Sequence, residues 1–180
     1  MTSARRLRVS YLALVGVIVV LDQVVKRLID RTMVLHESHP IIPGLLQLTY
    51  VRNRGGAFGL LSTGGLPLQD VVFPLVNAVV FGAMLFVALR IPARRFWVQT
   101  ALGLVLGGAL GNLIDRLAHG YVIDFVDVYW KSHHWPMFNV ADSAISVGVC
   151  LLILDMLREP QPSEGQPQAE TADAESARRS

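Results

Sequence analysis

The chain has 180 residues, about one domain's worth, and 52% of them are hydrophobic. With a mean hydropathy of +0.45 it is too apolar for an ordinary soluble fold, so we expect lipid to be its solvent. The 16 Lys and Arg nearly balance the 14 Asp and Glu, and no basic stripe is interleaved with aromatic residues, which argues against a nucleic-acid partner. The single cysteine excludes an intramolecular disulfide.

The first predicted element is a membrane-spanning helix over residues 9 to 29. Three arginines precede the apolar run from Val9 to Leu21, as in a signal peptide. No small-x-small cleavage site follows, and a helical pattern continues instead, so we predict a retained span. Asp22 and Lys26 stand at i and i+4 in this pattern, which predicts an intrahelical ion pair with a structural role.

Three further apolar runs are each near the roughly 20 residues that a ~30 Å hydrocarbon core requires. They are Val71 to Leu89, Phe96 to Ile114 and Phe138 to Leu157. Four spans put both termini on one side, and the arginines that flank the spans there predict that this side is cytoplasmic. The outer face then carries two long connections, residues 30 to 70 and 115 to 137, which hold most of the unusual polar side chains.

The two outer connections predict structure at the membrane surface. Alternation over Leu46 to Tyr50 favours a strand half immersed in the interface, and the glycine pair Gly55 and Gly56 is expected to end it. Tyrosines and tryptophans in the 115 to 137 connection predict an aromatic belt at headgroup depth. We therefore expect both connections to lie on the bilayer.

The composition changes beyond Arg158, where proline and acidic residues replace apolar ones. Such a segment cannot bury enough surface to offset its ordering entropy. We predict a membrane domain over residues 1–158 and a disordered cytoplasmic tail over residues 159–180. Near the inner end of the last span, Asp155 is expected to pair with Arg158 at i+3.

Two aspartates at the predicted outer face are candidates for catalysis. Asp142 lies about one turn into the last span, three residues after Asn139, so their side chains share a face. Asp124 lies just beyond the third span and meets Asp142 if the 115 to 137 connection folds back over the bundle. Carboxylates a few ångströms apart cannot both ionise, so one acts as a base toward water and the other as an acid, which is chemistry that cleaves a peptide bond without a metal. The alternative is two separate aspartates that face headgroups and water.

The third predicted span ends in small and polar residues. Glycines at every fourth position from Gly103 to Gly111 form a seam that lets another helix approach closely. Asn112 and Arg116 share a helix face and are suited to hold a carboxylate, a substrate carbonyl or a lipid phosphate. The alternative is a structural ion pair of Asp115 or Arg116 at the interface.

The sequence gives little support for a metal site or for a serine hydrolase. His119, His133 and His134 lack the spacing of a metal site, and we interpret them as loop histidines. Ser143 follows Asp142, but no GxSxG elbow or suitable histidine base accompanies it. We expect no metal and no cofactor.

Five blocks of the sequence together resemble the bacterial lipoprotein signal peptidases, also called signal peptidase II. The blocks are Asp22-Gln23-Val24-Val25-Lys26, Asn53-Arg54-Gly55-Gly56-Ala57-Phe58-Gly59, Gly111-Asn112-Leu113-Ile114-Asp115-Arg116, Gly120-Tyr121-Val122-Ile123-Asp124-Phe125 and Phe138-Asn139-Val140-Ala141-Asp142. Each block is weak alone, but their order between four predicted spans is highly specific. One departure is Gly56, where the family usually has alanine.

The resemblance implies an all-α integral membrane protein of the bacterial inner membrane, with four transmembrane helices and a small interfacial β-cradle over residues 40 to 60. It implies an aspartic endopeptidase, inhibited by globomycin, that removes signal peptides from diacylglyceryl-modified prolipoproteins by cutting before the lipidated cysteine. Asp124 and Asp142 match the catalytic pair. The positions that match substrate-binding residues are Asn53, Asn112, Arg116 and Asn139. The positions that match structural residues are Asp22, Lys26, Gly55, Gly108 and Gly111.

Two other classes of protein compete with this interpretation. A small transporter or proton-conducting protein would place charges near the membrane midplane and often show an internal repeat, whereas here the polar blocks cluster at one face. A scaffold or lipid-binding protein would tolerate the loss of either aspartate. We expect a monomer surrounded by membrane lipid, with its active site toward the outer face.

Overall fold

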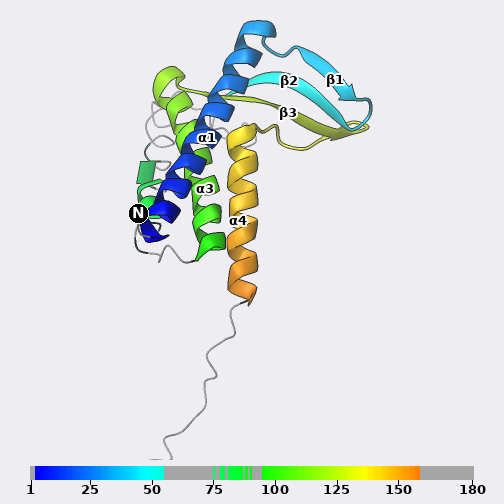
Figure 1. Cartoon of the computed structure of the whole chain (residues 1–180). Helices are drawn as coiled ribbons and strands as arrows, with labels where there is room; N and C mark the ends of the chain where they lie inside the picture. Colours follow the sequence, from blue (N-terminus) through cyan, green and yellow to red (C-terminus); the bar gives the residue numbers. More distant parts are fainter. Residues whose placement is uncertain are drawn as a thin grey trace, which may run out of the picture.

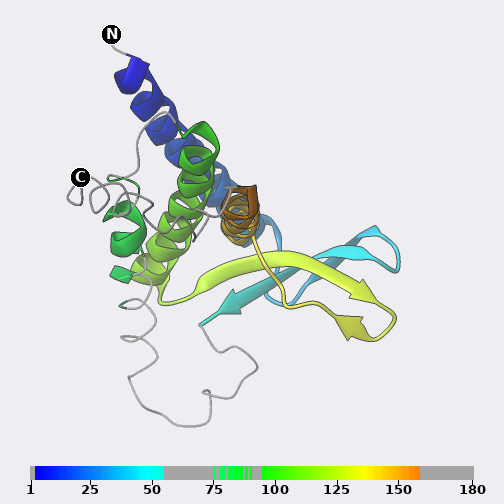
Figure 2. The same ribbon diagram turned by 90° about the horizontal axis from the view of Figure 1, so that it is seen from below.

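A bundle of helices carries an antiparallel sheet at one end (Figure 1). The helices are α1 (Ser3–Thr32), α3 (Phe96–His119) and α4 (Val140–Arg158). A computed structural model describes residues 3–54, 75, 78–79, 81–86, 88, 90 and 95–158, with side chains from residue 11 onward. Helix α3 packs against both α1 and α4, and the view from below shows the sheet reaching away from the bundle (Figure 2).

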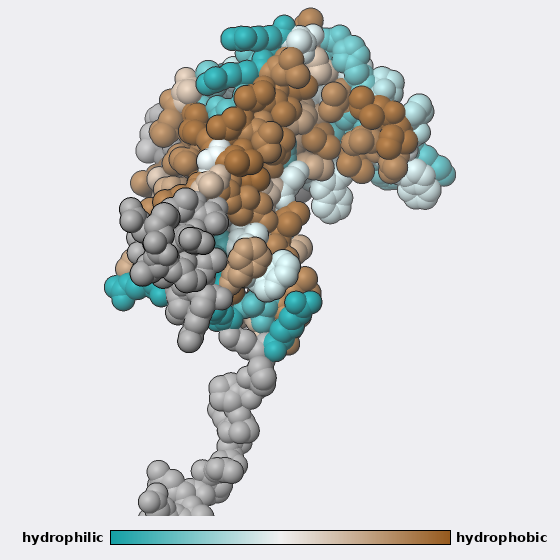
Figure 3. All heavy atoms as spheres, viewed as in Figure 1, coloured by the Kyte–Doolittle hydropathy of each residue, from teal (hydrophilic) through white to brown (hydrophobic). Residues whose placement is uncertain are grey.

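The outward faces of the helices are apolar. Helices α3 and α4 are each long and apolar enough to cross a membrane, and only 17% of the apolar window of α4 is buried inside the protein. On α1, the side chains of Val17, Val20, Val24 and Leu28 are between 53% and 60% exposed. Hydrophobic side chains form a continuous band over this face of the molecule (Figure 3). Such a surface is stable in lipid and not in water.

The predicted second span, Val71 to Leu89, lies largely outside the described residues. Those of its residues that are described are helical, and Phe81, Met84 and Ala88 pack against a cluster on α3. Gly55 and the predicted tail over residues 159–180 also lie outside the described residues.

Glycines on α3 allow the close approach of both neighbouring helices. A Cβ at Gly107 would lie 2.8 Å from the Cβ of Ile18 on α1, and a Cβ at Gly108 would lie 2.3 Å from the carbonyl oxygen of Ala141 on α4. The predicted seam is therefore confirmed toward α1, and Gly108 serves the opposite neighbour. Helix α3 ends where Gly120 adopts a φ of +73° and its N–H donates to the Arg116 carbonyl.

The sheet has the order β1-β2-β3-β4 with antiparallel neighbours. Its strands are β1 (Ser38–Ile42), β2 (Leu46–Asn53), β3 (Val122–Trp130) and β4 (His133–His134). The strand predicted from Leu46 is confirmed, but the sheet draws half of its strands from the 115 to 137 connection. That connection was predicted only as an aromatic belt, because its pairing with β2 joins residues about 75 positions apart and leaves no local signal.

A small core fastens the sheet to the C-terminal end of α1. Ile29 of α1 and Met33, which follows the helix, pack with Tyr50, Ile123 and Phe125 of the sheet, all of them buried. This attachment fixes where the ends of β2 and β3 lie relative to α3 and α4.

An ion pair joins the N-terminal end of α3 to the C-terminal part of α4. Asp155 Oδ2 lies 2.5 Å from Nη2 of Arg95, just before α3. The predicted pairing of Asp155 with Arg158 is wrong, because the antiparallel packing of α3 and α4 brings a cation from the neighbouring helix closer than one on the same helix.

Candidate active site

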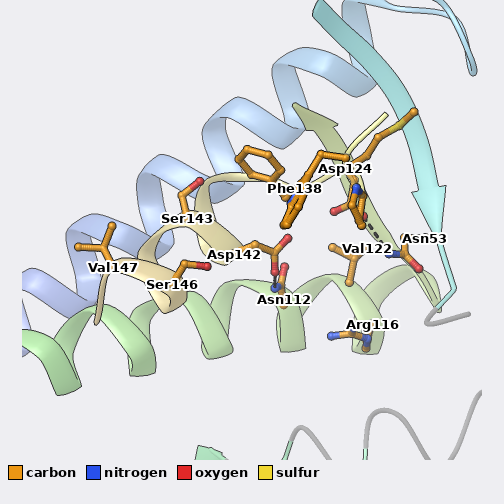
Figure 4. Close-up of a pocket in the computed structure, with 13 residues that line it drawn as sticks. Asn53, Asn112, Arg116, Val122, Asp124, Phe138, Asp142, Ser143, Ser146 and Val147 are labelled. Atoms are coloured by element: carbon orange, nitrogen blue, oxygen red, sulfur yellow. Dashed lines mark hydrogen bonds between the residues drawn. The ribbon is translucent and has the colours of Figure 1, made fainter. Parts of the chain in front are cut away.

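A cavity of about 520 Å³ lies where α3, α4 and the sheet meet. Asp124 and Asp142 enter it from β3 and α4, and their carboxylates face the same space (Figure 4). Asn53, Asn112 and Arg116 also line it. The structure thus brings together residues that are up to 89 positions apart, as predicted for these five.

Asp142 is held by the start of its own helix. Asn139 precedes α4, and its side-chain oxygen accepts the backbone N–H of Asp142 at 3.0 Å. In return, Oδ2 of Asp142 accepts the backbone N–H of Asn139 at 3.3 Å. This reciprocal pair is a capping box, and it places a carboxylate at the positive end of the helix dipole.

Asp124 lies deeper, with 3% of its surface exposed. Its two oxygens accept Nδ2 of Asn53 at 2.9 Å and Nδ2 of Asn139 at 2.7 Å. Burial raises the pKa of Asp124 to about 6; the negative charge of Asp142 adds to this rise, and the two amide donors oppose it. Asp124 therefore holds a proton at higher pH than an ordinary aspartate does.

Asn112 of α3 connects the two aspartates through hydrogen bonds. Its Nδ2 donates to Oδ1 of Asp142 at 2.8 Å, and its Oδ1 accepts Nδ2 of Asn139 at 3.2 Å. Because Asn139 also donates to Asp124, a continuous chain of hydrogen bonds runs from one carboxylate to the other. The asparagines therefore contact the carboxylates directly.

A second polar cluster lies behind Asn112, and it is fully buried. Lys26 Nζ lies 2.8 Å from Asp22 Oδ2 and 2.9 Å from Asp115 Oδ2. The intrahelical pair predicted for Asp22 and Lys26 is confirmed. Asp115 also forms a structural ion pair, which was the alternative to a binding role at this end of α3. Asp22 also accepts the backbone N–H of Ala141, and Asp115 accepts that of Ile123.

The partners of this second cluster immediately precede the two candidate catalytic residues in sequence. Ala141 comes before Asp142, and Ile123 comes before Asp124, so the cluster anchors the backbone on which each carboxylate is carried. A Cβ at Gly111 would lie 2.6 Å from Asp22 Oδ2. Glycine at this position is what lets the aspartate reach Ala141.

Arg116 lies on α3 at the edge of the cavity and is only partly exposed (Figure 4). Its Nε is buried and has no hydrogen-bond partner among the described residues. A guanidinium donor in that state is available to a ligand that enters the cavity.

The histidines take no part in the cavity. His134 Nδ1 lies 2.8 Å from Oδ1 of the buried Asp127, and its ring stacks on Tyr129. His133 and His134 form β4, so the prediction that they are loop residues is wrong. Among the residues that the structure describes, no group of three or more His, Cys, Asp or Glu side chains is arranged so that it could hold a metal ion.

Other lining residues gave no signal in the sequence. Val122, Phe138 and the two serines Ser143 and Ser146 line the same cavity. Ser146 had a signal that was available, since at four positions after Asp142 it lies on the same face of α4. From the sequence, Ser143 was weighed only as a nucleophile.

The matches to known proteins define the class of the chain as a membrane-bound aspartic peptidase. The chain belongs to the signal peptidase II family: the family model described as "Signal peptidase (SPase) II" matches residues 14–158. It is 53% identical over 140 residues to a lipoprotein signal peptidase of Geobacter sulfurreducens, covering 78% of this chain and 86% of that one. It is 41% identical over 151 residues to one of Syntrophus aciditrophicus, covering 84% and 94%.

Two solved structures, both bacterial membrane enzymes, have the same fold. One is 32% identical with a TM-score of 0.73, covering 84% of this chain and 94% of that one. The other is 31% identical with a TM-score of 0.74, covering 88% and 93%. The chain is therefore a bacterial membrane enzyme.

Proposed function

We propose that Asp124 and Asp142 are the catalytic pair with which this signal peptidase II removes signal peptides from prolipoproteins. The observation that carries the proposal is that two carboxylates share one cavity while their environments differ. Asp124 is buried with a pKa raised to about 6, whereas Asp142 is partly exposed at a helix N-terminus. Such a difference divides the roles of acid and base within a pair.

The reaction needs one proton shared by the pair. The ionised carboxylate takes a proton from a water molecule, whose oxygen bonds to the carbon of the scissile carbonyl. The protonated carboxyl donates its proton to the developing oxyanion. The carboxyl that took the proton from water then passes it to the leaving amine as the C–N bond breaks, and the hydroxyl formed from the oxyanion returns its proton to the other carboxylate. The two carboxyl groups end the cycle with one proton between them, ready for the next water.

Arg116 is the residue we propose for binding substrate. Its unpartnered Nε is suited to a peptide carbonyl or to the polar region of a lipid. Asn112 and Asn139 contact the carboxylates instead, as does Asn53, so we assign them to the placement of the pair. A diacylglyceryl anchor on the substrate would hold the bond beside it at a fixed depth and turn a search in three dimensions into local positioning.

The placement in the membrane follows from the same features. The cavity lies at the end of the bundle that carries the sheet, where Trp130 and Trp135 are 68% and 69% exposed. Exposed tryptophans favour headgroup depth. We propose four spans in the inner membrane as a monomer, with both termini cytoplasmic and the cavity toward the outer face.

The test is cleavage of a diacylglyceryl-modified prolipoprotein and of its unlipidated precursor by purified protein in detergent. Asp124→Asn and Asp142→Asn should each lower kcat by about 10²- to 10⁴-fold, the usual contribution of an acid or base. Wild type should process only the lipidated form.

Asp127→Asn is the matched control, because Asp127 is also a buried aspartate of β3 but bonds to Gln47 and His134 outside the cavity. It should cleave at nearly the wild-type rate. Wild-type rates in both Asp124→Asn and Asp142→Asn would rule out the pair.

A further inference from the structure

We infer that Lys26 is a positioning residue for catalysis: it fixes the side-chain amide of Asn112 so that an N–H points at Asp142, which makes Asp142 the base of the pair and Asp124 the acid. The inference rests on the proposed function of the two aspartates. It assigns a role in catalysis to a residue of α1 that contacts neither substrate nor the attacking water.

The ammonium group of Lys26 has its full set of acceptors. Its side chain is 1% exposed, and Nζ lies within 2.9 Å of Asp22 Oδ2, Asp115 Oδ2 and Asn112 Oδ1. An ammonium carries three N–H donors and no acceptor. Each donor therefore has one partner, and the bond to Asn112 is the branch that leads toward the cavity.

This bond determines which way the Asn112 amide faces. Because Lys26 only donates, the Asn112 atom that it meets must be the oxygen, and the NH₂ group must face Asp142. The hydrogen bonds of Asn139 require the same orientation of the Asn112 amide. Its own oxygen accepts a backbone N–H of Asp142, so its NH₂ faces the Asn112 oxygen.

The orientation has a consequence for the catalytic pair. As placed, Asp142 accepts one N–H at each carboxylate oxygen, from Asn112 and from the Asn139 backbone. Donors favour the ionised carboxylate. A reversed Asn112 amide would aim its oxygen at Asp142 and its NH₂ at the NH₂ of Asn139, which would favour a protonated Asp142 and exchange the roles of the pair.

Replacing Lys26 alone would leave Asp22 and Asp115 buried and unpaired, which endangers the fold itself. The test therefore uses a neutralised background, Asp22→Asn with Asp115→Asn. In this background Lys26→Gln and Lys26→Met are compared. The two side chains are of similar length and both uncharged, and only glutamine has an N–H to offer Asn112.

The expected result is that both variants have the same melting temperature in detergent and a similar KM for lipidated prolipoprotein. The kcat of the Lys26→Met variant should be about tenfold below that of Lys26→Gln. The reason is that an Asn112 amide that is no longer fixed loses its hydrogen bond to the charged Asp142 carboxylate. When Asn112→Ala is added to each, the difference between them should vanish, because the effect passes through Asn112.

Equal kcat in the Gln and Met variants, at whatever level, overturns the inference, as does a difference that persists with Asn112→Ala. Arg95→Gln with Asp155→Asn is the matched control, since it neutralises an ion pair at the other end of α3 and should leave kcat unchanged. Failure of the proposed function is distinguishable, because it would appear as cleavage by Asp124→Asn and Asp142→Asn in an otherwise wild-type chain.

Discussion

Two polar clusters lie on either side of Asn112, and both contain two aspartates. In the buried cluster, Asp22 and Asp115 share Lys26 and each accept a backbone N–H as well. In the cavity cluster, Asp124 and Asp142 accept only amide N–H groups and face open space.

The difference teaches what makes a carboxylate in a membrane protein chemically useful. A buried carboxylate that is paired with a cation and saturated with donors is fixed in place, and its role is to join the segments that carry its partners. A carboxylate that faces a cavity without a cation of its own can exchange a proton with water. The four aspartates at this end of the bundle thus divide into two that hold segments together and two that we propose take part in the reaction.

Breaking the buried cluster should have the largest effect. Asp115→Ala removes one counterion of Lys26 and leaves the N–H of Ile123 without its acceptor. We expect a loss of about 3–5 kcal/mol in the free energy of unfolding, the usual result of removing one partner of a buried pair. The measurement is thermal unfolding in detergent.

Asp155→Ala provides the comparison for this variant, because its ion pair with Arg95 is partly exposed and should cost less than about 1 kcal/mol. A similar loss in both variants would show that burial does not distinguish the two ion pairs.

The raised pKa of Asp124 in the cavity cluster should make the stability of the protein depend on pH. The pKa of Asp124 in the folded protein, about 6, lies above its ordinary value of 3.8. The folded state thus binds a proton that the unfolded state has released, so stability falls as pH rises from about 4 to 6, by up to about 3 kcal/mol. Asp124→Asn should lose this part of the pH dependence. Melting temperatures at pH 4 and pH 7 test it, and parallel curves for wild type and variant would contradict the raised pKa.

A smaller effect is expected where helix packing sets the distance between the clusters. Gly108→Ala places a Cβ against the carbonyl oxygen of Ala141, so α4 must move and carry Asp142 with it. We expect a loss of about 1–3 kcal/mol, typical of overpacking, together with a lower kcat.

Gly16→Ala is the matched control, since nothing lies within 4 Å of a Cβ there and alanine favours a helix. Equal stability and activity in the two alanine variants would show that the approach of α4 to Gly108 does not hold Asp142 in place.

The sequence predicted the residues of the cavity well and its architecture less well. Asp124 and Asp142 stood out because carboxylates near apolar spans are rare, and the spacing of Asp22 and Lys26 predicted their contact. The ion pair of Asp115 was harder to predict, since its partner Lys26 lies 89 positions away on another helix. No local pattern reports such a contact.

The sheet shows the same limit. Residues 46 to 50 alternate in the manner of a strand, but residues 122 to 130 do not alternate between apolar and polar side chains. The two aspartates of this segment, Asp124 and Asp127, are three positions apart and so fall on opposite faces of a strand. Their strand is defined by pairing with β2, in a register that sets Val51 opposite Asp124. Gln23 was also missed: its amide donates to Asp115 and to the Gly111 carbonyl, a role that depends wholly on how closely α3 approaches.

The place of Asp142 in the first turn of α4 has a consequence for how the enzyme is made. Protein chains are synthesised from the N-terminus, and their segments fold in that order. Asp124 and its strand are complete before α4 has left the ribosome, but the cavity then has one carboxylate and no Asn139 cap. Because Asp142 is half of the catalytic pair that we propose, we expect a half-made chain, already inserted among potential substrates, to have no protease activity until its final helix is in position.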